Sequence, residues 1–380
     1  MLDRPESADA VTLVSIDFNE PDYEESLYEL RQLVTTAGLK VTGTIEGKRS
    51  VPDAKLFIGS GKADDLKAML EAGETKLVAF NHDLSPSQQR NLERFLDARV
   101  VDRTGLILDI FAQRAQSHEG KLQVELAQLE HMSTRLVKGW SHLERQKGGI
   151  GVRGGPGETQ LELDRRLLRV RIKQLRGKLT KLKSQRGMQR RARRRSNLMS
   201  VSLVGYTNAG KSTLFNRLTR SEIYAADQLF ATLDTTSRKM HLPELEGYGS
   251  VPVVLSDTVG FIKHLPTTLI EAFGATLEEA AQADLLFHVV DMASTNRDAQ
   301  ISQVNKVLYD IGAEKVPQVL ILNQIDRLDC DAGFDRDEYG RIVRIRASAK
   351  TGKGMEYTRL ALQEHHAYLK KLSTEKTAYV

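Results

Sequence analysis

Residues 205–212 constrain the fold of this chain more than any other segment. They read Gly-Tyr-Thr-Asn-Ala-Gly-Lys-Ser, which fits the pattern G-x-x-x-x-G-K-[ST]. An apolar stretch, Val201–Val204, comes directly before them, and a helical pattern, Thr213–Leu218, follows. A glycine-rich turn between a strand and a helix points backbone N–H groups at a phosphate. The sequence therefore predicts an α/β domain that carries a phosphate-binding loop.

Each residue of this loop has an expected contact with a bound nucleotide. Lys211 is expected to neutralise the β- and γ-phosphates, and the Ser212 hydroxyl is expected to bind Mg²⁺. The other predicted nucleotide contacts in and beside the loop are Gly205, Tyr206, Thr207, Asn208, Ala209, Gly210 and Thr213.

A second motif, Asp257-Thr258-Val259-Gly260, follows the predicted strand Val251–Leu255 and has the D-x-x-G pattern. Its carboxylate, Asp257, is expected to hold Mg²⁺ through water. The N–H group of Gly260 is expected to reach the γ-phosphate. The spacing from Lys211 and the position directly after a strand favour this interpretation over a chance match.

The segment Phe230–Thr236 lies between these two motifs and reads Phe-Ala-Thr-Leu-Asp-Thr-Thr. One of its threonines is expected to bind Mg²⁺ and to order the segment when a γ-phosphate is present. Thr232 is the predicted ligand, and Thr235 is the alternative. Phe230 and Ala231 are also predicted to contact the nucleotide.

A third motif, Asn323-Gln324-Ile325-Asp326, resembles N-K-x-D and follows the predicted strand Val319–Leu322. The Asp326 carboxylate can accept hydrogen bonds from two donors of guanine, whereas adenine would leave it unpaired. Gln324 replaces the usual lysine. This replacement should weaken the affinity for the nucleotide but preserve the specificity for guanine. Ser348-Ala349-Lys350 fits the element that supports the base. The order of the motifs predicts a Ras-like GTPase that binds GTP and GDP.

Two positions bear on hydrolysis. Phe261 stands where many GTPases have a glutamine that orients water, and a phenyl ring cannot do this. Asn208 is typical of GTPases that bind K⁺ beside the phosphates, although it could instead only shape the loop. The predicted catalytic residues are Lys211, Thr232, Gly260 and Asn208. We expect slow turnover that a partner or potassium accelerates.

Residues 1–116 alternate strand and helix patterns and predict a separate small α/β domain. The predicted strands are Ala10–Ile16, Thr42–Glu46, Lys55–Ile58, Lys76–Phe80 and Arg99–Val101, and the predicted helices are Tyr23–Thr36, Ala63–Ala72 and Pro86–Asp97. Ser85 and Gln88 have the spacing of a capping box at a helix start. Gly59-Ser60-Gly61-Lys62 could bind a phosphate, but a tight turn or an RNA contact is favoured because it lacks the rest of a phosphate-loop pattern.

Residues 117–198 carry leucines at seven-residue spacing on both sides of a glycine-rich break at 147–157. This pattern predicts two helices folded antiparallel with a glycine-rich tip; the alternative is one long helix with a hinge. Arg165–Arg195 contains 15 of the 55 Lys and Arg residues of the chain and no Asp or Glu. Such a block indicates a polyanion partner, unless it is only a solvated helix face. Residues 199–380 are the predicted GTPase domain.

Composition restricts the class of protein further. The chain has one cysteine, Cys330, so an internal disulfide framework is excluded. Its apolar runs are far shorter than the roughly 18–20 residues of a membrane span, and its first residues lack a signal-peptide pattern. We therefore expect a cytoplasmic protein without a membrane span. Because the heptads are satisfied within one hairpin, we expect a monomer.

Several long segments together resemble the HflX GTPases of the Obg–HflX group. They are residues 101–115, 119–129, 144–166, 203–216, 229–236 and 257–266. The resemblance implies a GTPase that binds the ribosomal RNA of the large subunit and that splits or rescues stalled ribosomes during stress. We expect the protein in the cytoplasm, associated with the ribosome or with a membrane surface. The tip residues that would contact RNA are Arg145, Lys147, Gly148, Gly149, Arg153 and Gly154. The alternatives are a large-subunit assembly GTPase and an RNA-binding protein without splitting activity.

Overall fold

The computed structural model describes residues 10–20, 22–138, 156–195, 198–221, 229–230, 232–243, 250–263 and 274–378. The chain forms two compact units, Met1–Lys181 and Leu182–Val380. The predicted division into three domains, with boundaries after residues 116 and 198, stays a prediction. Among the described residues, no helix combines the length and the apolar character that crossing a membrane requires.

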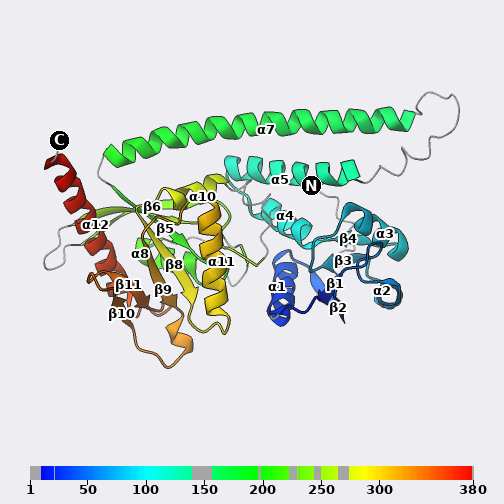
Figure 1. Cartoon of the computed structure of the whole chain (residues 1–380), viewed down its shortest axis with the longest axis horizontal. Helices are drawn as coiled ribbons and strands as arrows, with labels where there is room; N and C mark the ends of the chain where they lie inside the picture. The colour runs from blue at the N-terminus through cyan, green and yellow to red at the C-terminus, as the bar shows by residue number, and fades with distance from the viewer. Residues whose placement is uncertain are drawn as a thin grey trace. The chain divides into compact units, whose positions relative to one another are not determined.

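The first unit contains a four-stranded parallel sheet in the order β2-β1-β3-β4. Parallel strands need a crossover between them, and helices supply it here. The strands are β1 (Ala10–Asp17), β2 (Lys40–Lys48), β3 (Leu77–Phe80) and β4 (Arg99–Val101). The helices are α1 (Tyr23–Thr36), α2 (Ser60–Ala72), α3 (Pro86–Leu96) and α4 (Arg103–Arg114). The predicted α/β alternation is thereby confirmed (Figure 1).

Of two local predictions in this unit, the capping box is confirmed and one strand is wrong. At the start of α3, Ser85 Oγ accepts from Gln88 N and the Gln88 side chain accepts from Ser85 N, so the predicted capping box is confirmed. The predicted strand at Lys55–Ile58 is wrong. This segment forms a turn in which the Asp53 side chain accepts from Lys55 N and Leu56 N. Its apolar side chains are buried, which explains the strand-like pattern.

Two long helices follow, α5 (His118–Lys138) and α7 (Pro156–Arg195). Figure 1 shows α5 beside α7 with the two chain directions reversed. Leu122 and Leu126 of α5 and Leu175 of α7 are buried. Ion pairs join the two helices, Arg171 to Glu125 at 2.6 Å and Arg176 to Glu130 at 2.8 Å. The predicted antiparallel hairpin is confirmed, so one long hinged helix is excluded. Residues 139–155, which include most of the predicted glycine-rich tip, lie outside the described residues.

The second unit contains a seven-stranded sheet in the order β10-β11-β9-β8-β5-β7-β6. The five central strands are parallel, and β6 and β10 are antiparallel edges. The strands are β5 (Met199–Val204), β6 (Thr236–Leu242), β7 (Val251–Asp257), β8 (Leu285–Asp291), β9 (Gln318–Asn323), β10 (Gly333–Arg336) and β11 (Ile342–Arg346). The helices are α8 (Lys211–Thr219), α10 (Gly274–Ala281), α11 (Arg297–Asp310), the short 3₁₀ helix η1 (Ile325–Arg327) and α12 (Met355–Ala378).

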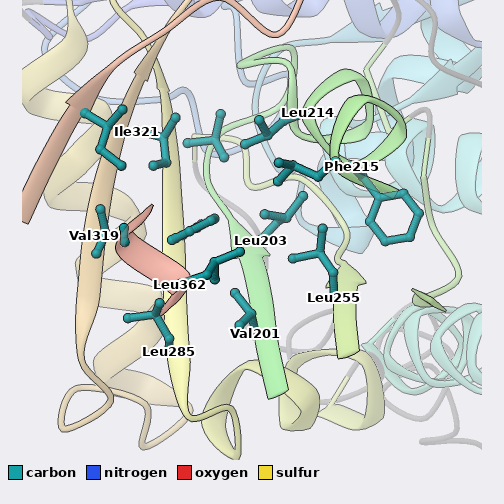
Figure 2. Close-up of a cluster of buried hydrophobic side chains, with 14 of the residues drawn as sticks. Val201, Leu203, Leu214, Phe215, Leu255, Leu285, Val319, Ile321 and Leu362 are labelled. Atoms are coloured by element: carbon teal, nitrogen blue, oxygen red, sulfur yellow. The ribbon is translucent and has the colours of Figure 1, made fainter. Parts of the chain in front are cut away.

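A buried apolar cluster fixes α8 to one face of this sheet. Figure 2 shows Leu214 and Phe215 of α8 together with Val201 and Leu203 of β5 and with Leu362 of α12. Side chains alternate across a strand, so every second residue of β5 enters this cluster. The cluster therefore holds the end of β5 and the start of α8 in fixed positions, and the loop between them carries the candidate site.

Candidate nucleotide and magnesium site

The loop between β5 and α8 has a backbone that requires glycine at two positions. Gly205 has φ 147°, and a Cβ there would lie 2.1 Å from the Val289 carbonyl oxygen. Gly210 has φ 90°, and a Cβ there would lie 2.3 Å from Asn323 Nδ2. Asn208 also has positive φ, 63°, which asparagine tolerates better than most residues. The glycines of the motif are thus explained by close approach of neighbouring backbone and side chain.

Lys211 is the first residue of α8, and its ammonium group lies inside the loop. Its Nζ donates to the carbonyl oxygens of Gly205, at 3.0 Å, and Tyr206, at 2.7 Å. Burial lowers the pKa of Lys211 to about 8, and the nearby Asp257 carboxylate opposes this effect. A bound phosphate would supply the compensating negative charge that a buried ammonium lacks.

The structure brings together the three residues predicted to hold Mg²⁺. Ser212 Oγ donates to Asp257 Oδ2 at 2.7 Å and lies 2.8 Å from Thr232 Oγ1. Thr232 Oγ1 also donates to Asp257 Oδ2, at 3.0 Å. The three groups come from α8, from the segment before β6 and from the end of β7. Mg²⁺ prefers oxygen ligands of this kind.

Asp257 shows why a cation suits this cluster. Its side chain is fully buried, and burial raises its pKa, although the Ser212 hydrogen bond opposes the rise. Its second oxygen, Oδ1, is buried and has no hydrogen-bond partner within the described residues. A buried carboxylate oxygen without a partner is costly. A divalent cation would supply the missing partner, so the residues present fit Mg²⁺.

The segment before β6 places its two candidate threonines differently. Thr232 joins Ser212 and Asp257, as described above. Thr235 Oγ1 is buried and has no hydrogen-bond partner among the described residues. Phe230 is buried with φ 54°, and Ala231 lies outside the described residues. The geometry therefore favours Thr232 over Thr235 as the residue that approaches the ion.

The D-x-x-G loop is joined to the phosphate-binding loop through the backbone. Thr207 N donates to Phe261 O at 2.7 Å, and Phe261 N donates to Gly205 O at 3.2 Å. A Cβ on Gly260 would lie 2.6 Å from Thr207 Cγ2, so only glycine fits there without a shift. The Phe261 side chain is 1% exposed. Its ring is therefore part of the core and offers no group to an attacking water.

The N-Q-x-D segment contacts both other loops of the site. Asn323 is buried, its Nδ2 donates to Ala209 O, and its Oδ1 accepts from Ala349 N, both at 2.9 Å. Asp326 Oδ1 accepts from Ser348 Oγ at 2.5 Å, while the residue itself remains exposed. The structure thus brings the predicted guanine-binding residues beside the phosphate-binding loop. Lys350, the last residue of the Ser348-Ala349-Lys350 segment, is exposed.

Hydrogen bonds made by three side chains at the site were not predicted from the sequence. Arg217, near the end of α8, donates through Nε to Ala349 O at 3.0 Å and through a second nitrogen to Lys350 O. Tyr206 Oη accepts from Lys263 N at 2.6 Å. The Gln324 side chain donates to Asn208 O at 3.0 Å. Each hydrogen bond joins segments far apart in sequence, so no short motif encodes it.

Three family models match successive parts of the chain between residues 24 and 324. Family models described as "GTP-binding GTPase N-terminal", "GTP-binding GTPase Middle Region" and "50S ribosome-binding GTPase" match residues 24–112, 114–193 and 200–324. GTPase HflX of Escherichia coli strain K12 is 52% identical over 365 residues, which are 96% of this chain and 84% of that protein. GTPase HflX of Magnetococcus marinus is 48% identical over 87% of this chain and 75% of that protein.

A solved structure supports the fold. The crystal structure of SsGBP in complex with GDP superposes with a TM-score of 0.52 at 24% identity, over 95% of this chain and 99% of that chain. At this identity the likeness concerns the fold alone, and it agrees with a mixed α/β protein that ends in a P-loop domain. Because the sequence relatives are closer and span most of both chains, this chain belongs to the HflX family of GTPases, enzymes that hydrolyse GTP.

Proposed function

We propose that this protein is a GTP-dependent factor that binds the RNA of the large ribosomal subunit and splits or rescues stalled ribosomes. The observation that carries the ribosomal part of the proposal is the outward face of α7, because RNA binding depends on cations that are free to meet phosphates. The description "50S ribosome-binding GTPase" of the family model over residues 200–324 supports the choice of the large subunit.

The outward face of α7 combines cations with apolar side chains. Its exposed cations without an ion pair among the described residues are Arg166, Arg169, Lys173 and Lys181. At 100° per residue they lie opposite the leucines that face α5, such as Leu175. Leu163 and Val170 are exposed on the same outward side. A basic surface with interspersed apolar contacts suits RNA, whose backbone is anionic and whose bases and sugars present apolar surface.

The predicted tip residues belong to the same proposal, and all of them lie outside the described residues. They are Arg145, Lys147, Gly148, Gly149, Arg153 and Gly154. In the proposed complex the hairpin supplies the RNA contacts, and the GTPase domain times binding and release. An assembly role on the large subunit would use the same contacts without separating the subunits.

The chemistry at the nucleotide site follows from its residues. When bound, Mg²⁺ would neutralise charge on the β- and γ-phosphates, held by Ser212, Thr232 and Asp257. Lys211 would neutralise the same phosphates, and the N–H group of Gly260 would contact the γ-phosphate. Because Phe261 offers no polar group, we propose that Asn208 contributes through a bound K⁺, as an additional cation beside the phosphates.

Binding to isolated subunits tests the RNA part of the proposal. The native chain should co-sediment with large subunits in the presence of a non-hydrolysable GTP analogue, and less with GDP. The double variant Arg169→Glu/Lys173→Glu should bind at least about tenfold more weakly, because reversed charges repel phosphates. The control Lys306→Glu/Lys315→Glu reverses as many exposed charges elsewhere. Equal loss in both variants, or binding to small subunits alone, would contradict the proposal.

A further inference from the structure

We infer that Arg327 and Asp291 are positioning residues of the nucleotide site, and that with Gln324 they replace the lysine of the usual N-K-x-D motif. The inference rests on the guanine-nucleotide site proposed above. It concerns how that site is held in a chain whose motif lacks the lysine, and it assigns a role to two residues outside every motif found in the sequence.

A continuous row of hydrogen bonds joins the phosphate-binding loop to the end of β8. Gln324 Nε2 donates to Asn208 O at 3.0 Å, and Gln324 Oε1 accepts from Arg327 Nη1 at 2.9 Å. Arg327 Nη1 also donates to Asp291 Oδ2, at 3.0 Å. Asp291 Oδ1 accepts from Ala293 N at 2.8 Å, so the last member of the row is fixed by backbone.

The row solves a problem that glutamine creates and lysine does not. An ammonium group only donates hydrogen bonds, so a lysine at position 324 would always present a donor to a carbonyl oxygen. The glutamine amide has a donor end and an acceptor end of nearly equal shape. If it flipped, its oxygen would face Asn208 O and repel it. Arg327 prevents this, because a guanidinium has only donors and must meet Oε1.

The contact matters because the loop carbonyls set the direction of the loop N–H groups. Asn323 Nδ2 holds Ala209 O, and Gln324 Nε2 holds the preceding carbonyl, Asn208 O. Asn208 has φ 63°, a conformation that needs support in a residue other than glycine. Two successive carbonyls are thereby held on the side of the N-Q-x-D segment. The peptide N–H groups of the loop are left for the phosphates.

Arg327 acts on the nucleotide site rather than on the fold. Its side chain is 58% exposed, whereas that of Asp291 is 19% exposed. An ion pair this exposed contributes little to stability. Its removal should therefore leave the nucleotide-free protein folded. What changes is the fraction of molecules in which Gln324 presents its donor to Asn208, and with it the affinity for nucleotide.

A double-mutant cycle on GDP affinity tests the inference. The four proteins are the native chain, Arg327→Ala, Gln324→Lys and the double variant, measured by calorimetric titration with GDP in the presence of Mg²⁺. Arg327→Ala should weaken GDP binding by about three- to tenfold in the native background, the net value of one hydrogen bond whose charged donor is partly exposed. In the Gln324→Lys background the same change should have an effect below about twofold, because lysine needs no orienting partner.

Two further variants separate positioning from general surface effects. Asp291→Asn should also weaken GDP binding, because it removes the carboxylate charge that holds the Arg327 guanidinium in place. Arg336→Ala removes an arginine of another surface ion pair, with Glu364, and should leave GDP affinity unchanged. The thermal unfolding temperature of the nucleotide-free protein should be the same in all these variants.

The possible failures are distinguishable. If Arg327→Ala weakens binding by the same factor in both backgrounds, or leaves the native affinity unchanged, the inference is wrong while the nucleotide site stands. If the native chain binds no GDP at all, the site itself is wrong. A lower unfolding temperature in Arg327→Ala alone would show a structural role instead.

Discussion

At the scale of single residues, the nucleotide site is organised around one buried carboxylate. Asp257 accepts hydrogen bonds from Ser212 and Thr232 on one oxygen and leaves the other without a partner among the described residues. Hydroxyl groups alone do not neutralise a buried charge, so the cluster is arranged for a cation. The two threonines before β6 test this directly, because only one of them touches the cluster.

Thr232→Ala should raise the Mg²⁺ concentration needed for half-maximal GTP turnover by about tenfold or more, since a group beside the ion is removed. Thr235→Ala is the matched control and should leave that concentration nearly unchanged. The measurement is a Mg²⁺ titration of phosphate release at saturating GTP. The reverse order of the two variants would show that Thr235 approaches the ion instead.

Asn208 allows the two interpretations of its role to be separated. If its side chain helps to bind K⁺, turnover should be severalfold faster in KCl than in NaCl at equal ionic strength. Asn208→Gly permits the same positive φ but removes the side chain. The advantage of KCl should then disappear in this variant. If the native chain turns over GTP equally in both salts, Asn208 only shapes the loop.

At the scale of elements, sequence patterns predicted best where one local rule decides the structure. The phosphate-binding loop was predictable because Gly205 and Gly210 have no room for a side chain. A Cβ atom at either position would collide with a neighbouring backbone or side-chain atom. The capping box at Ser85 was predictable because it involves residues three positions apart. The segment Lys55–Ile58 misled the prediction because buried apolar residues can fill a turn as well as a strand.

The choice between Thr232 and Thr235 shows the limit of such patterns. Both lie in the same short segment. The Thr232 hydroxyl is hydrogen-bonded to Asp257, and the Thr235 hydroxyl is buried without a hydrogen-bond partner among the described residues. Which one meets Asp257 depends on how the segment crosses the end of β7, which no local rule fixes. The same holds for Arg217 and Arg327, whose partners lie on other loops.

Strand β8 carries a polar residue that makes stability depend on pH. Burial lowers the pKa of His288 to about 4, against a usual value of 6.5, while a hydrogen bond with Gln318 opposes the change. Between these two values the unfolded chain binds a proton that the folded chain does not. The free energy of unfolding should therefore fall as pH decreases from about 6.5 to 4, by about 3 kcal/mol at most.

The variant His288→Leu should remove that part of the pH dependence. His288 lies between Val204 of β5 and Leu320 of β9, where an apolar side chain of similar size can be accommodated. The measurement is urea unfolding at pH values from 7 to 4.5, followed by a signal specific to the GTPase domain. A native chain and a variant with equal slopes against pH would contradict the assignment.

At the scale of the whole molecule, the proposed account joins an RNA-binding helix to a nucleotide switch. Helix α7 ends at Arg195, and β5, which leads into the phosphate-binding loop, begins at Met199. The proposed RNA surface and the GTP site therefore follow one another directly in the chain. Because the leucine seams of α5 and α7 face each other within one hairpin, we expect a monomer. A sedimentation mass of one chain would agree with this.

The central claim is that GTP binding drives a hairpin-dependent action on ribosomes. The most direct test is gradient sedimentation of purified 70S ribosomes with the protein and a non-hydrolysable GTP analogue, GDP or ATP. A variant with residues 148–157 replaced by a short linker runs in parallel. The account predicts that 70S particles convert to subunits only with the native chain and the GTP analogue. An intact 70S peak under every nucleotide would contradict the splitting claim, and binding to free large subunits would then favour the assembly role.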